Sequence, residues 1–169
     1  IIVGKKPTGT LVTDYLLPGK NLYLIGTGTG LAPWLSIIRD PDTYERYEKV
    51  IVVHGVRHVA DLAYQEMLEK DLFEHEILGD IIKDKLIYYP TVTREPFRNQ
   101  GRISDQIENG TFPQNIGLPP LNRETDRVML CGSPEMLDTL KHMFEARGFN
   151  EGNTTTPGDF VIERAFVEK

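Results

Sequence analysis

The sequence contains a single cysteine, Cys131, among its 169 residues, so an intramolecular disulfide is impossible. That absence is compatible with a reducing compartment, and we expect a cytoplasmic protein. No apolar run reaches the length of a membrane span, and the N-terminus lacks a signal-peptide pattern. The sequence therefore predicts a protein without a membrane partner.

Positive charge is also scarce overall. The chain has 19 Lys and Arg against 25 Asp and Glu, a formal net charge of −6. Because a negative field repels polyanions, we exclude nucleic acid as the main partner, although a local group of arginines can still bind a small anion. The histidines show neither metal-ligand spacing nor a Ser-His-acid pattern. We expect no metal, and we place the histidines on the surface or behind the ligand-binding residues.

Short apolar runs alternate with stretches of helical periodicity from Asn21 onward. The runs that we expect to be strands are 22–25, 50–53, 86–89, 128–130 and 160–162. Near-continuous apolar strands are typical of a parallel sheet that is covered on both faces. We therefore predict an α/β fold, a doubly wound five-stranded parallel sheet with helices on both faces, whose ligand binds at the carboxyl ends of the strands.

Helix signals fill the segments between these runs. Pro33 stands where a first helical turn begins, Asp61 is placed to cap a second helix, and Ser133 is placed to cap a third. Residues 104–109 allow only a short helix. The three prolines and the lack of periodicity in 111–127 predict an irregular segment.

A glycine-rich turn, Gly26-Thr27-Gly28-Thr29-Gly30, follows the first predicted strand. Glycines let the backbone approach a ligand closely, and the following helix start offers free N–H groups to a phosphate. Thr27 and Thr29 add hydroxyl groups. The turn matches neither the G-x-G-x-x-G pattern nor the P-loop, and a tight turn without a ligand is the alternative reading.

Three arginines follow the ends of neighbouring predicted strands. Arg57 comes after the second strand, Arg94 after the third, and Arg102 at the start of the short helix. NAD-binding folds commonly place an acidic residue near the end of the second strand, whereas an arginine there suits a 2′-phosphate. Each arginine taken singly is more often a solvated surface residue. Their shared placement predicts NADP(H), held by bidentate hydrogen bonds.

Cys131 ends the fourth predicted strand, directly before a glycine and a helix start. A lone cysteine in an apolar strand is usually a small buried side chain. Its position at a strand end instead favours a place near the predicted ligand site. There the following helix start can lower the pKa of the Cys131 thiol.

Taken together, these motifs resemble those of bacterial ferredoxin (flavodoxin)–NADP reductases. They are the glycine turn with Leu-Ala-Pro, His54-Gly-Val-Arg57, Tyr-Tyr-Pro-Thr-Val-Thr-Arg94, Gln-Gly-Arg102, Cys131-Gly-Ser-Pro and the ending Ile-Glu-Arg-Ala-Phe-Val-Glu-Lys169. The resemblance covers almost the whole chain. It implies the C-terminal NADP-binding domain of an enzyme whose N-terminal β-barrel binds FAD.

The resemblance divides the chain at about residue 18. Residues 1–18 resemble the last barrel strand and the linker, and residues 19–169 resemble the NADP-binding domain with its C-terminal tail. The family's flavin-binding Arg-x-Tyr-Ser/Thr motif is absent, and the sequence begins at Ile1 instead of Met. We therefore expect a fragment that binds nucleotide without acting as a reductase. The whole enzyme would be a monomer that exchanges electrons with ferredoxin or flavodoxin.

The resemblance also implies roles for individual residues. It assigns the pyrophosphate of NADP to the turn from Thr27 to Gly30 and the 2′-phosphate to the three arginines. Cys131 would lie near the nicotinamide, and Glu163 would assist hydride transfer. Ala165 would face the flavin ring, where plant-type relatives have an aromatic residue, and Phe166 would belong to a tail that packs along the FAD.

Two alternatives stay open. The first is an NADH-dependent flavin reductase module of the cytochrome b5 reductase or flavohaemoglobin type, against which Arg57 and the C-terminal extension argue. The second is a non-catalytic nucleotide-binding domain that stands alone. The linker-like residues 1–18 argue against this second reading.

Overall fold

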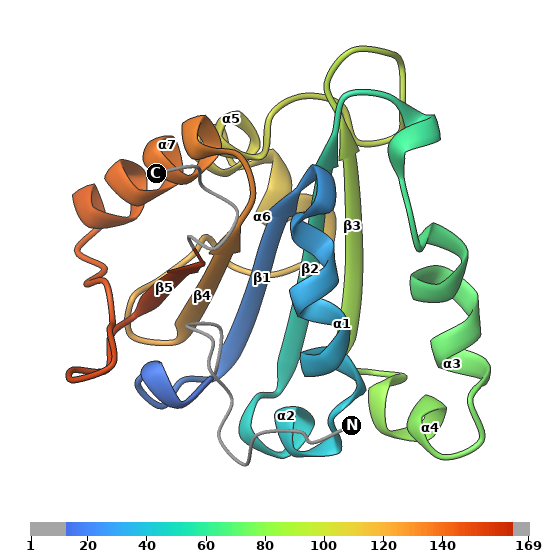
Figure 1. Cartoon of the computed structure of the whole chain (residues 1–169), viewed down its shortest axis with the longest axis horizontal. Helices are drawn as coiled ribbons and strands as arrows, with labels where there is room; N and C mark the ends of the chain where they lie inside the picture. The colour runs from blue at the N-terminus through green and yellow to red at the C-terminus, as the bar shows by residue number, and fades with distance from the viewer. Residues whose placement is uncertain (1–12, 164–169) are drawn as a thin grey trace, which may run out of the picture.

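The computed structural model describes residues 13–163, apart from the side chains at positions 29 and 30. Five strands form one parallel sheet in the order β3-β2-β1-β4-β5 (Figure 1). They are β1 (Asn21–Thr27), β2 (Lys49–Val56), β3 (Leu86–Val92), β4 (Asp126–Cys131) and β5 (Phe160–Glu163). The predicted doubly wound parallel sheet is confirmed.

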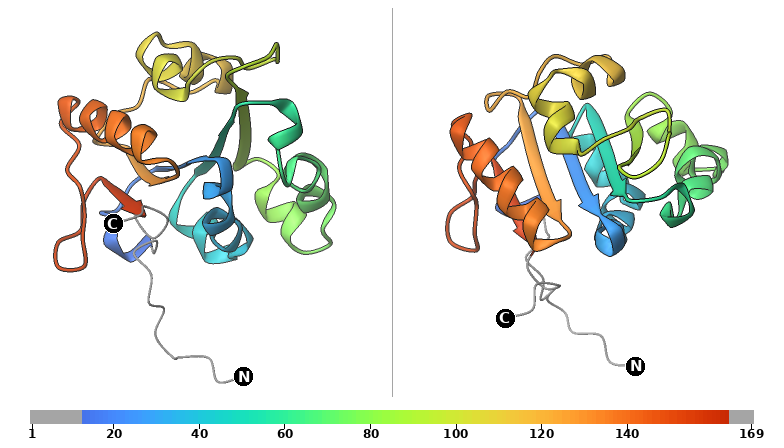
Figure 2. Two further views of the ribbon diagram at one scale, coloured as in Figure 1. Left: turned by 45° about the horizontal axis from the view of Figure 1, so that its top comes forward. Right: turned by 90° about the horizontal axis from the view of Figure 1, so that it is seen from above.

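Helices cover both faces of this sheet (Figure 2). One face carries α1 (Ala32–Arg39), α2 (Pro41–Arg46), α3 (Leu72–Glu74) and α4 (Leu78–Ile82), and the other carries α5 (Ile103–Glu108), α6 (Thr111–Ile116) and α7 (Pro134–Ala146). Short 3₁₀ turns are η1 (Thr13–Tyr15), η2 (Gly28–Leu31) and η3 (Val59–Asp61), and η4 (Met67–Asp71) is a π-helical segment.

Each face of the sheet has its own hydrophobic core, because successive side chains of a strand point to opposite faces. On β1, Leu22 and Leu24 pack in the core that contains Trp34 of α1, while Tyr23 packs in the core that contains Phe144 of α7. These five side chains are fully buried. Burial of one such side chain contributes roughly 1.5–3 kcal/mol, so the central strands have to be apolar on both faces. This requirement explains their continuous apolar runs.

Two of the predicted helix starts are confirmed. Pro33 lies in the first turn of α1, and the Ser133 hydroxyl accepts a hydrogen bond from the Met136 N–H of α7 at 3.3 Å. The prediction for Asp61 is wrong. Its carboxylate accepts a hydrogen bond from the His58 N–H at 3.3 Å and closes the turn η3, so the next helix starts later in the chain.

The segment 111–127 was expected to be irregular, and that expectation is wrong for α6. Gly110, with φ +82°, precedes the helix, and the Asn109 side chain accepts from the Thr111 N–H at 2.9 Å. Pro113 is tolerated because it lies in the first turn, where a missing N–H breaks no helical hydrogen bond. These local features supply a helix start that hydrophobic periodicity does not reveal.

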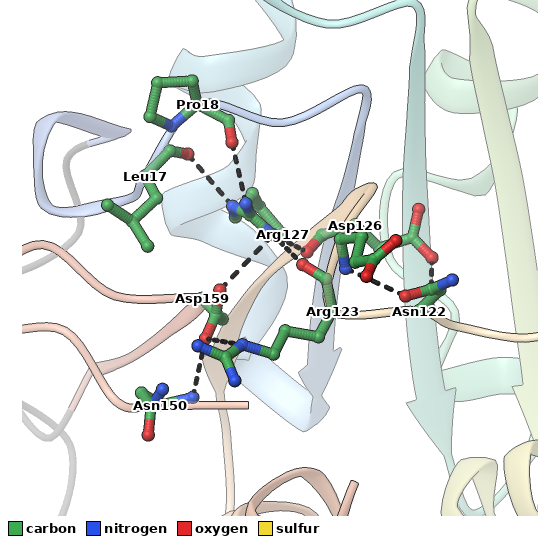
Figure 3. Close-up of polar contacts among 9 residues, drawn as sticks. Leu17, Pro18, Asn122, Arg123, Asp126, Arg127, Asn150 and Asp159 are labelled. Atoms are coloured by element: carbon green, nitrogen blue, oxygen red, sulfur yellow. Dashed lines mark hydrogen bonds and ion pairs between the residues drawn. The ribbon is translucent and has the colours of Figure 1, made fainter. Parts of the chain in front are cut away.

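A buried arginine lies at the amino edge of the sheet, the edge at which the strands begin (Figure 3). The Arg127 guanidinium donates to the main-chain carbonyls of Leu17, Pro18, Arg123 and Asp126 at 2.6–3.1 Å. It also lies 3.5 Å from the Asp159 carboxylate, and the two side chains are only 7% and 2% exposed. Arg127 therefore ties the segment before β1 to β4 and to the loop before β5.

Replacing Arg127 with methionine should lower the free energy of unfolding by about 3 kcal/mol, because it leaves the buried Asp159 carboxylate without its buried ion-pair partner. The matched control is Arg123→Met. Arg123 lies 3.4 Å from the same carboxylate, but its side chain is 53% exposed, so its loss should cost under about 1 kcal/mol. Urea denaturation of both variants measures their free energies of unfolding. Equal losses of stability in the two variants would contradict the structural role assigned to the buried Arg127.

Candidate functional site

A cleft of about 1240 Å³ lies along the carboxyl edge of the sheet. This edge of the sheet is at the top of Figure 1. The loops that follow β1, β2, β3 and β4 all contribute to its lining, together with the start of α5. In the strand order, β1 lies between β2 and β4, so the chain crosses over to opposite sides of β1. Doubly wound sheets bind ligands at such a reversal of strand order. The cleft lies at the carboxyl ends of the strands, where the sequence predicted the ligand.

The glycine turn forms the part of the cleft that follows β1. Gly28 has φ +56°, and a Cβ atom at this position would meet no protein atom within 4 Å. Thr29 and Gly30 continue the turn as part of η2. Leu31, the N-cap residue of α1, provides no side-chain cap to the first N–H groups of the helix. An open glycine backbone before an uncapped helix start is suited to bind a phosphate group.

His54, on β2, contacts the backbone of this glycine turn. Its side chain is fully buried, and its Nε2 lies 2.8 Å from the Gly28 carbonyl oxygen. Since a carbonyl only accepts, Nε2 must carry the proton. Burial lowers the pKa of His54, so the ring is neutral at pH 7. Sequence reasoning did not assign this contact, although the position of His54 at a strand end was a usable signal.

A second close approach joins the glycine turn to the loop after β4. The Ser133 N–H donates to the Thr27 hydroxyl oxygen at 3.1 Å. Gly132, which directly follows β4, has φ +147°. A Cβ atom at this position would stand only 2.2 Å from the Thr27 hydroxyl oxygen and 3.0 Å from the Thr27 nitrogen. Only glycine fits at this position. Thr27 thus holds the two loops together, and sequence analysis did not single out Gly132.

All three predicted arginines line the same cleft. The Arg94 N–H donates to the Arg57 carbonyl at 2.9 Å, so the two residues are held side by side as β2 and β3 continue into their loops. Glu95 accepts a hydrogen bond from the Val59 N–H and fastens the same two loops. Within residues 13–163, neither Arg57 nor Arg94 forms an ion pair, whereas Arg102 lies 3.4 Å from the Glu135 carboxylate.

Cys131 and Glu163 are neighbours on paired strands, but neither lines the cleft. The Cys131 side chain is fully buried, and Glu163 is 9% exposed. Burial, together with the nearby Glu163 carboxylate, raises the pKa of the Cys131 thiol to about 11. The helix start therefore does not lower this pKa, and the thiol is neutral at pH 7. Ala165 and Phe166 lie outside the described residues.

Within the described part of the chain, no group of three or more His, Cys, Asp or Glu side chains is arranged to hold a metal ion. None of the helices described there is long and apolar enough to cross a membrane.

The sequence profile of the oxidoreductase NAD-binding domain matches residues 24–142. The chain belongs to this family. The NAD-binding domain is 59% identical over 170 residues to the ferredoxin–NADP reductase of Pseudomonas aeruginosa. This alignment covers 100% of the chain and 66% of the relative, so the chain spans just under two thirds of that protein.

Solved structures show the same relationship. A ferredoxin NADP⁺ reductase from Neisseria gonorrhoeae with bound FAD and NADP is 28% identical and superimposes with a TM-score of 0.80, covering 92% of this chain and 60% of that one. A flavohaemoglobin from Malassezia yamatoensis, at 17% identity and a TM-score of 0.59, covers 92% of this chain and 34% of that one. The flavohaemoglobin shares the fold alone. The resemblance to ferredoxin–NADP reductases that the motifs indicated is confirmed.

The pH dependence of stability tests the neutral state of His54. Because burial lowers its pKa in the folded domain, the unfolded chain binds a proton more readily, and stability is lost as the pH falls below about 6.5. His54→Gln keeps an N–H donor for the Gly28 carbonyl but does not titrate. Between pH 7.5 and 5.5, the natural domain should lose about 1 kcal/mol more stability than this variant. Urea denaturation at both pH values measures the difference, and parallel losses would contradict a buried neutral ring.

Proposed function

We propose that this NAD-binding domain binds NADP(H) and positions its nicotinamide for reversible hydride transfer to FAD, as part of a ferredoxin or flavodoxin–NADP reductase. The observation that carries this proposal is the pair Arg57 and Arg94, held side by side in the cleft without carboxylate partners among the described residues. Two guanidinium groups so placed suit the dianionic 2′-phosphate that distinguishes NADP from NAD.

The order of the strands gives the nucleotide a direction along the cleft. The 2′-phosphate end would lie over β2 and β3, where the two unpaired arginines are. The pyrophosphate would lie over β1 at Gly28, where the space that a Cβ atom would fill is open. The nicotinamide end would then lie over β4, on the side of Cys131 and Glu163.

Within this arrangement, the residues of the domain bind and orient the nucleotide. Gly28 and the first N–H groups of α1 would hold the pyrophosphate, while His54 keeps the Gly28 carbonyl turned toward its ring. Bound FAD would supply the redox chemistry, accepting the hydride from the reduced nicotinamide. The neutral Cys131 thiol adds no charge beside the nicotinamide. We keep Glu163 as the residue that assists the transfer.

The whole enzyme's partners are part of the same proposal. Ferredoxin or flavodoxin would exchange electrons with the flavin, and the enzyme would act as a cytoplasmic monomer. We further propose that residues 1–18 connect this domain to the one that holds FAD. In support, Arg127 binds the Leu17 and Pro18 carbonyls and fixes where the chain enters the domain.

The two alternatives make different predictions about the nucleotide. An NADH-dependent flavin reductase module would gain nothing from the unpaired arginines, and a non-catalytic domain would bind nucleotide without a flavin partner. The 59% identity to a ferredoxin–NADP reductase favours the proposed NADP(H)-binding domain of such a reductase over these two alternatives. Comparing affinities for NADPH and NADH separates it from the NADH-dependent module.

Replacing Arg94 with alanine should weaken binding of 2′,5′-ADP by about 1.5–3 kcal/mol, the range for hydrogen bonds to charged groups. Binding of AMP, which lacks the 2′-phosphate, should change little. Arg57→Ala should have the same selective effect, and Arg98→Ala, a change outside the cleft lining, serves as the control. Titration calorimetry measures these affinities. Equal losses for both ligands would overturn the assignment of the arginines to the 2′-phosphate.

Replacing Gly28 with valine should abolish nucleotide binding while the fold persists. The valine side chain would occupy the open space beside the turn, and a β-branched side chain disfavours a backbone with φ +56°. The circular dichroism spectrum should remain that of the natural domain, and calorimetry should detect no binding of 2′,5′-ADP. A folded variant with normal affinity would refute the phosphate-binding role of the turn.

A further inference from the structure

A buried network of hydrogen bonds joins β3 to α5 and α6. At its centre is Gln106 of α5, a polar residue that is only 4% exposed. Its Nε2 donates to the Thr91 hydroxyl oxygen at 2.8 Å and to the Gly101 carbonyl at 2.9 Å. Its Oε1 accepts from the Tyr89 hydroxyl at 2.7 Å, and Asn115 of α6 donates to that hydroxyl oxygen at 3.0 Å. The side chains of Gln106, Thr91, Tyr89 and Asn115 form what we call the Gln106 network.

The hydrogen bonds of Gln106 fix the orientation of its amide. A glutamine amide has two N–H donors, and here both are used. Because the Gly101 carbonyl only accepts, the NH₂ group must face it, and the Oε1 atom must face the Tyr89 hydroxyl. A methionine would fill a similar space without the cost of burying an amide. Core packing alone therefore gives no reason for a glutamine at this position.

The network holds the backbone that directly precedes Arg102. Gly101 has φ +111°, and its carbonyl accepts from two buried side chains, Gln106 at 2.9 Å and Thr91 at 2.8 Å. Its N–H donates to the Val92 carbonyl of β3 at 2.9 Å. Both polar groups of the Gly101 main chain are therefore bonded to the sheet or to α5.

Arg102 depends on this anchor because its side chain is exposed. The side chain is 68% exposed and lies 3.4 Å from the Glu135 carboxylate, whose side chain is 78% exposed. Exposed ion pairs of this kind contribute little, so Glu135 does not fix the guanidinium. Bidentate binding of a phosphate requires a precisely placed guanidinium group, and residues behind the binding group supply that precision.

We propose that Gln106 is a positioning residue, which acts through the Gly101 carbonyl to place Arg102 for the 2′-phosphate. Gln106 does not line the cleft, so it has no direct contact with a ligand there. This inference rests on the proposed function and extends it to a buried residue of α5. It implies that the affinity for the 2′-phosphate depends on hydrogen bonds inside the protein.

Replacing Gln106 with methionine should weaken binding of 2′,5′-ADP by roughly 3- to 10-fold, the effect of one ordinary hydrogen bond. Binding of AMP, which lacks the 2′-phosphate, should be unchanged. The matched control is Tyr89→Phe, which removes a hydroxyl from the same network but leaves both hydrogen bonds to the Gly101 carbonyl. It should lower stability in urea without changing the ratio of the two affinities. Titration calorimetry measures both ligands.

The second measurement repeats the change in a domain that lacks the Arg102 side chain. In the Arg102→Ala background, Gln106→Met should cause no further loss of 2′,5′-ADP affinity, because its effect passes through Arg102. A merely structural role would cause the same loss in both backgrounds and would overturn the inference. Unchanged affinity in Gln106→Met, equal losses for 2′,5′-ADP and AMP, or a lost preference in Tyr89→Phe would overturn it as well.

Thr91→Val provides the same test if Gln106→Met does not fold, as judged by circular dichroism. Valine has nearly the shape of threonine but lacks the hydroxyl that donates to the Gly101 carbonyl, so the same selective loss is expected, and its absence would overturn the inference. Arg94→Ala separates this inference from the proposed function. If Arg94→Ala selectively weakens 2′,5′-ADP and Gln106→Met does not, only the role of Gln106 fails. If the natural domain shows no preference for 2′,5′-ADP over AMP, the proposed function fails, and this inference fails with it.

Discussion

The parallel pairing of β1 with β2 on one side and β4 on the other is the constraint on which the rest of the structure depends. Because every strand runs in the same direction, each crossover has to return over a face of the sheet, and each strand ends at the same edge. The helices of the crossovers bury both faces. What is left open is the carboxyl edge, where the loops after four strands meet around one cleft.

The two edges of the sheet use arginine in opposite ways. At the amino edge, Arg127 is buried, and its donors are satisfied by main-chain carbonyls and Asp159. At the carboxyl edge, Arg57 and Arg94 have anchored backbones and exposed side chains that form no ion pair with another described residue. A satisfied buried arginine contributes to the fold, while an unpaired exposed arginine is available for a ligand.

Burial also determines which groups near the cleft carry charge. The desolvation of His54 lowers its pKa, and the desolvation of Cys131 raises its pKa, so both side chains are neutral at pH 7. The arginine guanidinium group is a permanent cation in proteins. The positive charge that the cleft offers a phosphate therefore comes from its arginines and the helix start of α1, and it does not depend on a histidine.

The sequence by itself determined the parallel sheet, because strands buried on both faces must be continuously apolar, and it indicated the glycine turn and the three arginines, because strand ends share an edge. It did not predict α6, whose start depends on local caps at Gly110 and Asn109. Only the tertiary structure joined His54 to Gly28 and Gln106 to Thr91, and required a glycine at position 132. Some of these features are contacts between segments that are distant in sequence, and others depend on a backbone dihedral angle. Hydrophobic periodicity predicts neither long-range contacts nor individual dihedral angles.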